Sequence, residues 1–175
     1  MQDILTCAMG LDIHRDVIVA CLAKGELGAD PEIEIRSFST LIPEMRKLRD
    51  WVLEAECHHV AMESTGIYWQ PIYEMLEPCF DGQISILVVN ARHMKNVPGR
   101  KTDMRDAQWI ATLLRAGLLK GSFIPDKTFR ELRHLTRYRK SIVHDITAQK
   151  NRIDKFLQSS GFRFTAFLSD AFGAS

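Results

Sequence analysis

Residues 90–115 run NARHMKNVPGRKTDMRDAQWIATLLR and place two aspartates where a helix is expected to begin. Pro98-Gly99 marks a turn, and apolar residues recur at helical spacing after it, so we expect the helix to start at Asp103. Residues three apart share one face of a helix, which puts Asp103 and Asp106 side by side. Paired carboxylates supply the oxygen ligands that Mg²⁺ prefers. The alternative, that Asp103 only complements the helix dipole, stays open.

The charge around this pair is positive, and so is the whole second half of the chain. Residues 1–88 carry 6 Lys/Arg and 15 Asp/Glu, whereas residues 89–175 carry 17 and 7, so net charges of −9 and +10 give the overall +1. Such asymmetry indicates polyanion binding, with a solvated basic face as the alternative. Five cations near the aspartates could neutralise them or bind phosphates: Arg92, Lys95, Arg100, Lys101 and Arg105.

Length and composition favour a globular protein without a membrane span. The chain has 175 residues, 46% of them hydrophobic, which suits one domain plus an appendage. No apolar run approaches the roughly 18 residues of a transmembrane helix, and the first residues lack signal-peptide features, so we expect a cytoplasmic protein. The cysteines form no CxxC motif and are expected as buried reduced thiols rather than disulfides or zinc ligands: Cys7, Cys21, Cys57 and Cys79.

The rest of the chain alternates strands with helices. The first two expected strands form a hairpin, the third alternates polar and apolar residues, and the fifth is apolar throughout, as if buried on both faces. A helix opened by Pro43 follows the third strand, and an aromatic helix with Pro71 in its first turn follows the fourth. This order predicts an α/β fold with a mixed five-stranded sheet flanked by helices. The strands are expected at residues 7–13, 17–22, 32–38, 59–62 and 84–89.

Two further acidic residues stand at the carboxyl ends of expected strands. Asp12 ends the first strand and Glu63 follows the fourth, and ligands of open α/β sheets bind at such ends. Each alone could be a turn or capping residue, but neighbouring strands would bring them together. Carboxylates about 4 Å apart repel by roughly 4 kcal/mol at an effective dielectric constant of 20, so a cluster with Asp103 and Asp106 needs a cation.

A long amphipathic helix is expected over residues 125–160. Its apolar residues, from Phe129 to Phe156, follow steps of three, four and seven, which is typical of a coiled-coil-like seam. The seam could pack back on its own domain, or the helix could self-associate as a dimer or tetramer with its basic face towards nucleic acid. The expected nucleic-acid-binding residues of this helix are Arg130, Arg133, Arg137, Arg139 and Lys140.

Several long motifs resemble one family. The chain contains GLDIH at residues 10–14, MESTGIYWQPIYEMLE at 62–77, and VVNARHMKNVPGRKTDMRDAQWIATLLRAGLL at 88–119. Shorter matches are SFIP at 122–125, RELRHLTRYR at 130–139 and LSDAFGAS at 168–175. Together they resemble the N-terminal part of the DEDD transposases, insertion-sequence recombinases related to the pilin-gene invertases.

This resemblance implies a RuvC-like, RNase H-like fold over residues 1–124. The four acidic residues of the family motif fall on Asp12, Glu63, Asp103 and Asp106, which would act in catalysis by binding one or two Mg²⁺ ions. In the family, long helices mediate assembly, a structured bridge RNA pairs with target and donor DNA, and a serine in a C-terminal domain attacks DNA. Residues 161–175 would begin the linker to that domain, so strand exchange by this chain alone is not expected.

Four functions are weighed. The first is the catalytic metal-binding domain of an RNA-guided DNA transposase that acts on the ends of an insertion element and its target. The second is a non-catalytic module for nucleic-acid binding and dimerisation, and the third is a RuvC-like nuclease acting alone on branched DNA. A sugar kinase of related core fold is disfavoured because no second half with a nucleotide-binding glycine loop is present.

Overall fold

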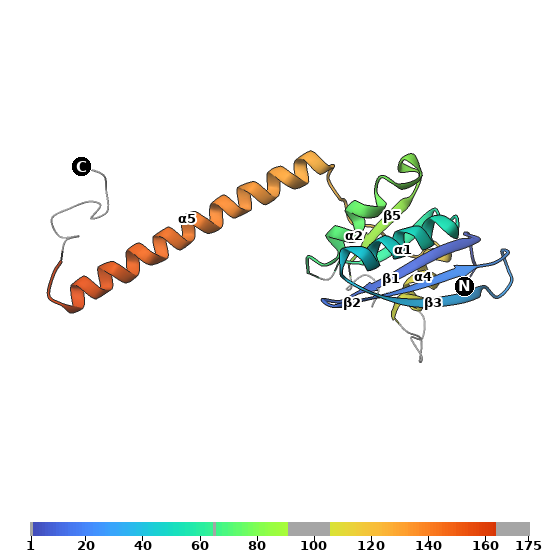
Figure 1. The fold of residues 1–175 in the computed structure, drawn as a ribbon, viewed down its shortest axis with the longest axis horizontal. Helices are drawn as coiled ribbons and strands as arrows, with labels where there is room; N and C mark the ends of the chain where they lie inside the picture. Colours follow the sequence, from blue (N-terminus) through green and yellow to red (C-terminus); the bar gives the residue numbers. More distant parts are fainter. Residues whose placement is uncertain (1, 65, 91–105, 164–175) are drawn as a thin grey trace. The chain divides into compact units, whose positions relative to one another are not determined.

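The chain forms two compact units. The computed structural model describes residues 2–64, 66–90 and 106–163 (Figure 1). Residues 1–124 form the first unit, here the sheet unit, and residues 125–175 form the second, here the helix unit. Within the described residues, no helix is both long enough and apolar enough to cross a membrane.

The sheet unit is built on five strands in the order β3-β2-β1-β4-β5 (Figure 1). Strands β1, β2 and β3 are antiparallel neighbours, whereas β4 runs parallel to β1, and β5 runs parallel to β4. This mixed sheet confirms the predicted RNase H-like fold class, including the hairpin and the antiparallel third strand. The strands span Cys7–Ile13 (β1), Val17–Lys24 (β2), Glu32–Ser39 (β3), His59–Glu63 (β4) and Ser85–Val89 (β5).

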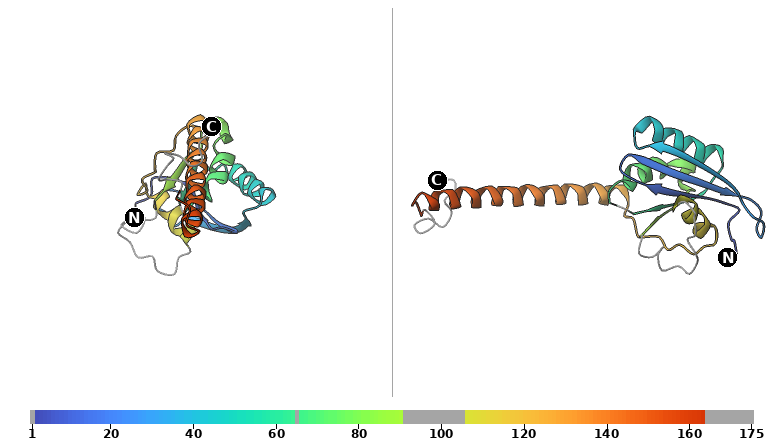
Figure 2. Two further views of the ribbon diagram at one scale, coloured as in Figure 1. Left: turned by 90° about the vertical axis from the view of Figure 1, so that its left-hand side faces the viewer. Right: turned by 90° about the horizontal axis from the view of Figure 1, so that it is seen from below.

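Helices cover both faces of the sheet. Helices α1 (Ile42–Glu54) and α2 (Trp69–Leu76) pack on one face, and α4 (Asp106–Arg115) packs on the other. The right-hand view of Figure 2 shows α1 in cyan and α4 in olive on opposite sides of the strands. A short 3-10 helix, η1 (Cys79–Gly82), follows α2.

Side chains of β1 alternate between these two faces, as the pleat of a strand requires. Met9, Leu11 and Ile13 lie in the core beneath α1 and α2, whereas Ala8 lies in the smaller core that α4 covers. Gly10 and Asp12 follow Ala8 by two and four residues, so they lie on the same face of the sheet as Ala8, the face that α4 covers. The alternation of side chains along β1 therefore places Asp12 on the side of α4 rather than on the side of α1 and α2.

The fifth strand differs from the prediction. It was expected to be buried on both faces, but Ser85 is exposed and Ile86 and Leu87 are only partly buried. The reason is position, because β5 is an edge strand with a single β-strand neighbour, β4. Apolar composition alone cannot separate a central strand from a protected edge.

The cysteines confirm part of the expectation. All four are free thiols, and Cys21 and Cys57 are fully buried, but Cys7 and Cys79 are only half-buried. The expected start of the helix at Asp103 lies outside the described residues, which resume at Asp106.

The helix unit contains one long helix, α5 (Lys127–Ser159), which confirms that prediction. The Asp126 side chain caps it, since Oδ1 accepts a hydrogen bond of 3.0 Å from the backbone amide of Phe129. No Pro or Gly interrupts its 33 residues. Its large apolar side chains are exposed in this single chain: Phe129, Leu132, Leu135, Tyr138, Ile142, Val143, Ile146, Ile153 and Phe156.

Candidate metal centre

Asp12 and Glu63 occupy equivalent places on neighbouring parallel strands. The register of β1 and β4 pairs Gly10 with Ala61 and Leu11 with Met62, so its next step sets Asp12 level with Glu63. Ala61 lies in the core beneath α4, and Glu63, two residues further, has the same facing. Adjacent strands lie about 4.8 Å apart. The structure therefore places both residues side by side, on the α4 face, at the carboxyl ends of β1 and β4.

The Asp12 carboxylate is partly shielded and has a neighbour of its own. Its side chain is 15% exposed, and His14 Nε2 lies 3.1 Å from Asp12 Oδ2 while the imidazole remains 60% exposed. A ring N–H donated to Oδ2 would restrict the orientation of the carboxylate. His14 therefore belongs to the candidate site, although sequence reasoning did not include it.

Helix α4 reaches the same edge of the sheet through a very close contact at Gly10. A Cβ atom at that position would clash with the Ala107 carbonyl oxygen and the Ala111 amide nitrogen. The main chains of β1 and α4 are therefore in direct contact, which only glycine permits.

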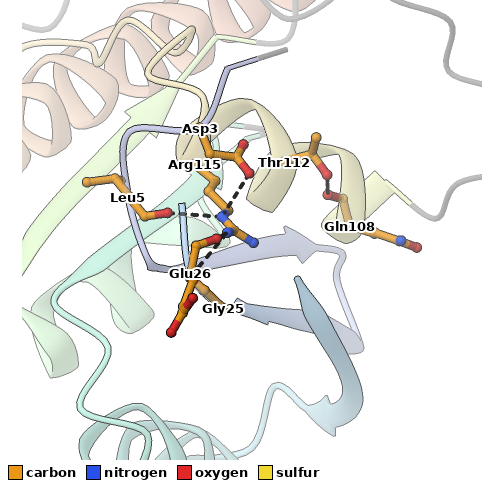
Figure 3. Close-up of polar contacts among 7 residues, drawn as sticks. All are labelled: Asp3, Leu5, Gly25, Glu26, Gln108, Thr112 and Arg115. Atoms are coloured by element: carbon orange, nitrogen blue, oxygen red, sulfur yellow. Dashed lines mark hydrogen bonds and ion pairs between the residues drawn. The ribbon is translucent and has the colours of Figure 1, made fainter. Parts of the chain in front are cut away.

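The other end of α4 is held near the start of β1. Arg115, the last residue of α4, is 1% exposed, and its Nε donates to the Leu5 carbonyl at 2.9 Å and lies 3.2 Å from Asp3 Oδ2. Its Nη2 donates to the carbonyls of Gly25 and Glu26, at 3.2 and 2.7 Å. Figure 3 shows these groups converging on the guanidinium.

These contacts fix the direction of α4. Its last residue lies beside Leu5, before β1 begins, and Ala107 lies over Gly10 in the middle of β1. The helix is thus antiparallel to β1, and its first residue, Asp106, is at the end nearer Asp12. Asp106 is exposed, as a residue at the rim of the sheet should be.

The fourth acidic residue and five cations lie outside the described residues: Asp103, Arg92, Lys95, Arg100, Lys101 and Arg105. In the part of the chain that is described, no three Asp, Glu, His or Cys side chains gather closely enough to hold a metal ion. The four-carboxylate centre therefore stays a prediction, with three members placed on one face and edge of the sheet.

Four of the five predicted basic residues of α5 are exposed: Arg133, Arg137, Arg139 and Lys140. The exception is Arg130, which is 7% exposed and donates from Nη1 to the Pro125 carbonyl at 2.8 Å. Helical spacing puts Arg133, Arg137 and Lys140 opposite the apolar residues, whereas Arg139 falls between Leu135 and Ile142 on the apolar side.

Sequence reasoning missed Gly10 and Arg115 as well as His14. Gly10 precedes Asp12 by two residues in GLDIH, and a glycine inside a strand pattern is a known sign of close backbone approach. Arg115 had only a weak signal, a charge ending an apolar helix. Its partners near residues 5 and 25 are too distant in sequence for a local pattern to indicate.

The strand order, with helices on both faces of the sheet, is that of the RNase H-like fold. The model of the IS110-type DEDD family, described as transposase, matches residues 9–161. Because that match covers most of the 175 residues, the chain belongs to this transposase family, and the resemblance of its motifs is confirmed.

Individual relatives either have low sequence identity to the chain or align with a smaller part of it than the family model does. The chain is 36% identical over 61 residues to "Putative transposase y4qE" of Sinorhizobium fredii, which is 35% of this chain but 16% of that protein. Among solved structures, Thermus thermophilus RuvC aligns over 66% of this chain and 99% of its own, with 11% identity and a TM-score of 0.47. RuvC of the same species in complex with a Holliday junction substrate aligns over 67% and 100%, with 12% identity and a TM-score of 0.42.

Proposed function

We propose that the sheet unit is the catalytic Mg²⁺-binding domain of a DNA transposase that cleaves and exchanges strands at an insertion element. One observation carries this proposal: Asp12 and Glu63 stand level on adjacent parallel strands, on the face that α4 crosses with Asp106 at the nearer end. Family membership supplies the reaction class. A DNA substrate would place the protein in the compartment that holds the DNA, and we propose the cytoplasm of a prokaryotic cell.

The residues suit a hard divalent cation. Carboxylate oxygens are the ligands Mg²⁺ prefers, and it usually takes one or two of them together with water and substrate phosphate. Two carboxylates about 5 Å apart repel by roughly 3 kcal/mol at an effective dielectric constant of 20, so a bound cation would stabilise Asp12 and Glu63 together. Asp103 and Asp106 would complete the set.

Each residue has a separate task in this proposal. Asp12 and Glu63 hold the cation against the rigid sheet, and His14 restricts the Asp12 carboxylate. Asp106 supplies a ligand from α4, whose distance from the sheet is set at Gly10. Bound Mg²⁺ would supply charge stabilisation at the scissile phosphate. The serine nucleophile and the guide RNA of the family enter only through the resemblance.

The test compares Asp12→Asn and Glu63→Gln with Asp16→Asn. Asp16 is an 88% exposed aspartate in the β1–β2 turn, paired with Arg15, and is the matched control. At ten times the dissociation constant, Mg²⁺ should stabilise the wild-type chain by about 1.4 kcal/mol, seen as a rise in Tm. The control should keep that rise and the two site variants should lose it.

Recombination by the full-length transposase is the second measurement. Asp12→Asn and Asp106→Asn should abolish DNA strand exchange, while Asp16→Asn should leave it intact. Normal exchange by either site variant would overturn the metal-binding role, even if Mg²⁺ binds elsewhere on the chain.

A second function is self-association combined with nucleic-acid binding. It is favoured by α5, which has an apolar side and a basic side. Its heptad-spaced apolar residues are exposed in the single chain, for example Leu135 at 67% and Ile146 at 51%. A helix with such a stripe must bury it, and a second copy of the helix fits the spacing. Arg139 and Gln149 interrupt this apolar stripe at its two heptad positions, and polar residues at such positions can fix register and oligomeric state.

The basic side of α5 would then contact phosphates of DNA or structured RNA. Binding should weaken steeply with salt, and Arg137→Ala should reduce the slope of log affinity against log salt by about 1. Arg49→Ala is the control, since this residue belongs to the sheet unit, where it pairs with Asp50, and should leave the slope unchanged. Equal effects of the two substitutions would contradict the assignment of phosphate contacts to the basic side of α5.

A further inference from the structure

The amino end of β1 carries a cysteine pair that the proposed function does not use. Cys7 begins β1, and Cys57 lies between α1 and β4. Extending the register of Met9 with Val60 by two residues sets Cys7 level with His58, directly beside Cys57. With neighbouring strands about 4.8 Å apart and successive residues about 3.3 Å apart, the Cα atom of Cys57 would lie roughly 6 Å from that of Cys7, within the about 4.4–6.8 Å that disulfides span.

The end of α1 holds Cys57 in place. Glu56 adopts a left-handed conformation with φ 52°, its amide donates to the Leu53 carbonyl at 3.0 Å, and the Cys57 amide donates to the Val52 carbonyl at 3.1 Å. This pair of bonds is a Schellman motif, which stops the helix in a defined geometry. The Cys57 sulfur also lies 3.3 Å from the His59 carbonyl oxygen, which is an alternative acceptor for its single S–H proton.

The two thiols are chemically different. The hydrogen bond from Cys57 and the charges of Lys24 and Arg115 lower the pKa of Cys7 to about 7, against burial, which raises it. The same hydrogen bond and burial raise the pKa of Cys57. Of the two sulfurs, Cys57 therefore keeps its proton more firmly, and Cys7 has the larger thiolate fraction. Because Arg115 is held by backbone carbonyls and Asp3, its charge near Cys7 is fixed.

Solvent reaches Cys7 but not Cys57. Cys57 is fully buried, whereas Cys7 is half-buried and lines a cavity of about 240 Å³. Glu56, His58 and His59 line the same cavity. A water molecule occupies about 30 Å³ in the liquid, so the cavity admits a small oxidant such as hydrogen peroxide.

We propose that Cys7 and Cys57 form a redox-active pair, in which a hydroperoxide oxidises Cys7 and Cys57 converts the product to a disulfide. The site lies at the amino end of β1, five residues or roughly 16 Å from Asp12 along the strand. It is therefore independent of the proposed metal centre.

The two steps balance with the hydroperoxide as the oxidant. The Cys7 thiolate attacks one peroxide oxygen, the O–O bond breaks, and with one proton the products are a Cys7 sulfenic acid and water or an alcohol. The Cys57 sulfur then attacks the Cys7 sulfur, the S–O bond breaks, and the thiol proton leaves with the hydroxyl as water. Two electrons pass from the two thiols to the peroxide.

The other two cysteines are controls within the same chain. Burial raises the pKa of Cys21 to about 11 and also raises that of Cys79. Cys79 is half-buried like Cys7, so accessibility is similar while the ionisation differs. A thiol of pKa 7 has about 50-fold more thiolate at pH 7 than one of pKa 9, and its weaker nucleophilicity reduces that advantage to about fivefold.

The first experiment needs no substitution. The folded chain is treated with hydrogen peroxide at pH 7, remaining thiols are alkylated, and the peptides are mapped by mass spectrometry. We expect a Cys7–Cys57 linked peptide, reversible by a thiol reductant, and at least fivefold slower loss of the Cys79 thiol. Oxidation of Cys79 as fast as Cys7, or the absence of the linked peptide once Cys7 is oxidised, would overturn the proposal.

Two variants separate the roles of the pair. In Cys57→Ser, Cys7 should still be oxidised but remain as a sulfenic acid that dimedone traps. In Cys79→Ser, the matched control, the disulfide should form as in the wild type. If Cys57→Ser gave no dimedone adduct on Cys7 while the wild type formed the disulfide, Cys7 would not be the attacking thiol and the assignment would be wrong.

Discussion

The sheet unit and the helix unit bury their apolar residues to opposite extents. In the sheet unit, strands and helices share continuous cores, and even a charged residue, Arg115, is 1% exposed. In α5, apolar residues such as Phe129, Leu132 and Phe156 are between 54% and 70% exposed. The sheet unit is therefore stabilised by its own packing, whereas α5 carries a surface that suits a partner. Substitutions in one unit should leave the stability of the other unchanged.

The largest effect is expected from Gly10→Val. The new side chain would push α4 away from β1, because its Cβ alone clashes with the main chain of Ala107 and Ala111. We expect destabilisation of the sheet unit by more than about 3 kcal/mol, measured by denaturant unfolding. Gly28→Ala is the control, since nothing lies within 4 Å of its Cβ and only its φ of 85° opposes alanine, at about 1 kcal/mol. Equal losses would contradict the close contact.

Arg115→Met should follow, with a loss of about 3 kcal/mol. The substitution leaves the Leu5, Gly25 and Glu26 carbonyls without their donor and Asp3 without its buried partner. The measurement is again the free energy of unfolding. Arg49→Met is the matched control because its ion pair with Asp50 is on the surface, where such pairs contribute less than about 1 kcal/mol.

Ile142→Asp should weaken self-association without destabilising the sheet unit. Each copy would lose one buried isoleucine, about 3 kcal/mol per dimer, which is on the order of a 100-fold weaker association. Sedimentation or light scattering gives the mass, and thermal unfolding gives the stability of the sheet unit. A wild-type chain that is monomeric at high concentration would show that α5 finds its partner elsewhere.

The smallest effects are at the ends of helices. Asp126→Ala removes the cap of α5 and should lower its helicity at the first turn, with a cost of about 1 kcal/mol. Glu56→Gly should instead stabilise the sheet unit by about 1 kcal/mol, because glycine adopts a φ of 52° without strain. Faster hydrogen exchange of the Phe129 amide would show the loss of the cap in Asp126→Ala. A higher midpoint of unfolding would show the gain in stability of Glu56→Gly.

Local patterns predicted most of the fold. Period-two alternation at residues 32–38 placed an antiparallel strand, and uninterrupted heptad spacing placed α5, because each depends on neighbours within a few residues. The convergence of Asp12 and Glu63 was predicted only on condition that their strands are neighbours. The observed pairing of β1 with β4 supplies that condition.

What could not be predicted depends on distant contacts. Arg115 bonds to Leu5 across 110 residues and to Gly25 across 90, so no window of sequence contains both partners. The edge position of β5 follows from strand order rather than composition, and the half-burial of Cys7 fits its place as the first residue of β1. Apolar sequence around a residue indicates that it can be buried, not that the fold covers it.

The contact at Gly10 makes the position of Asp106 independent of the side chains that fill the core. Main-chain atoms of β1 and α4 touch directly, so van der Waals radii, rather than the fit of side chains, determine the spacing between them. Repacking the surrounding core would therefore alter stability without altering the height of Asp106 above the strands. Substitutions in the core should therefore leave the geometry of the site unchanged, whereas a side chain at position 10 would alter it.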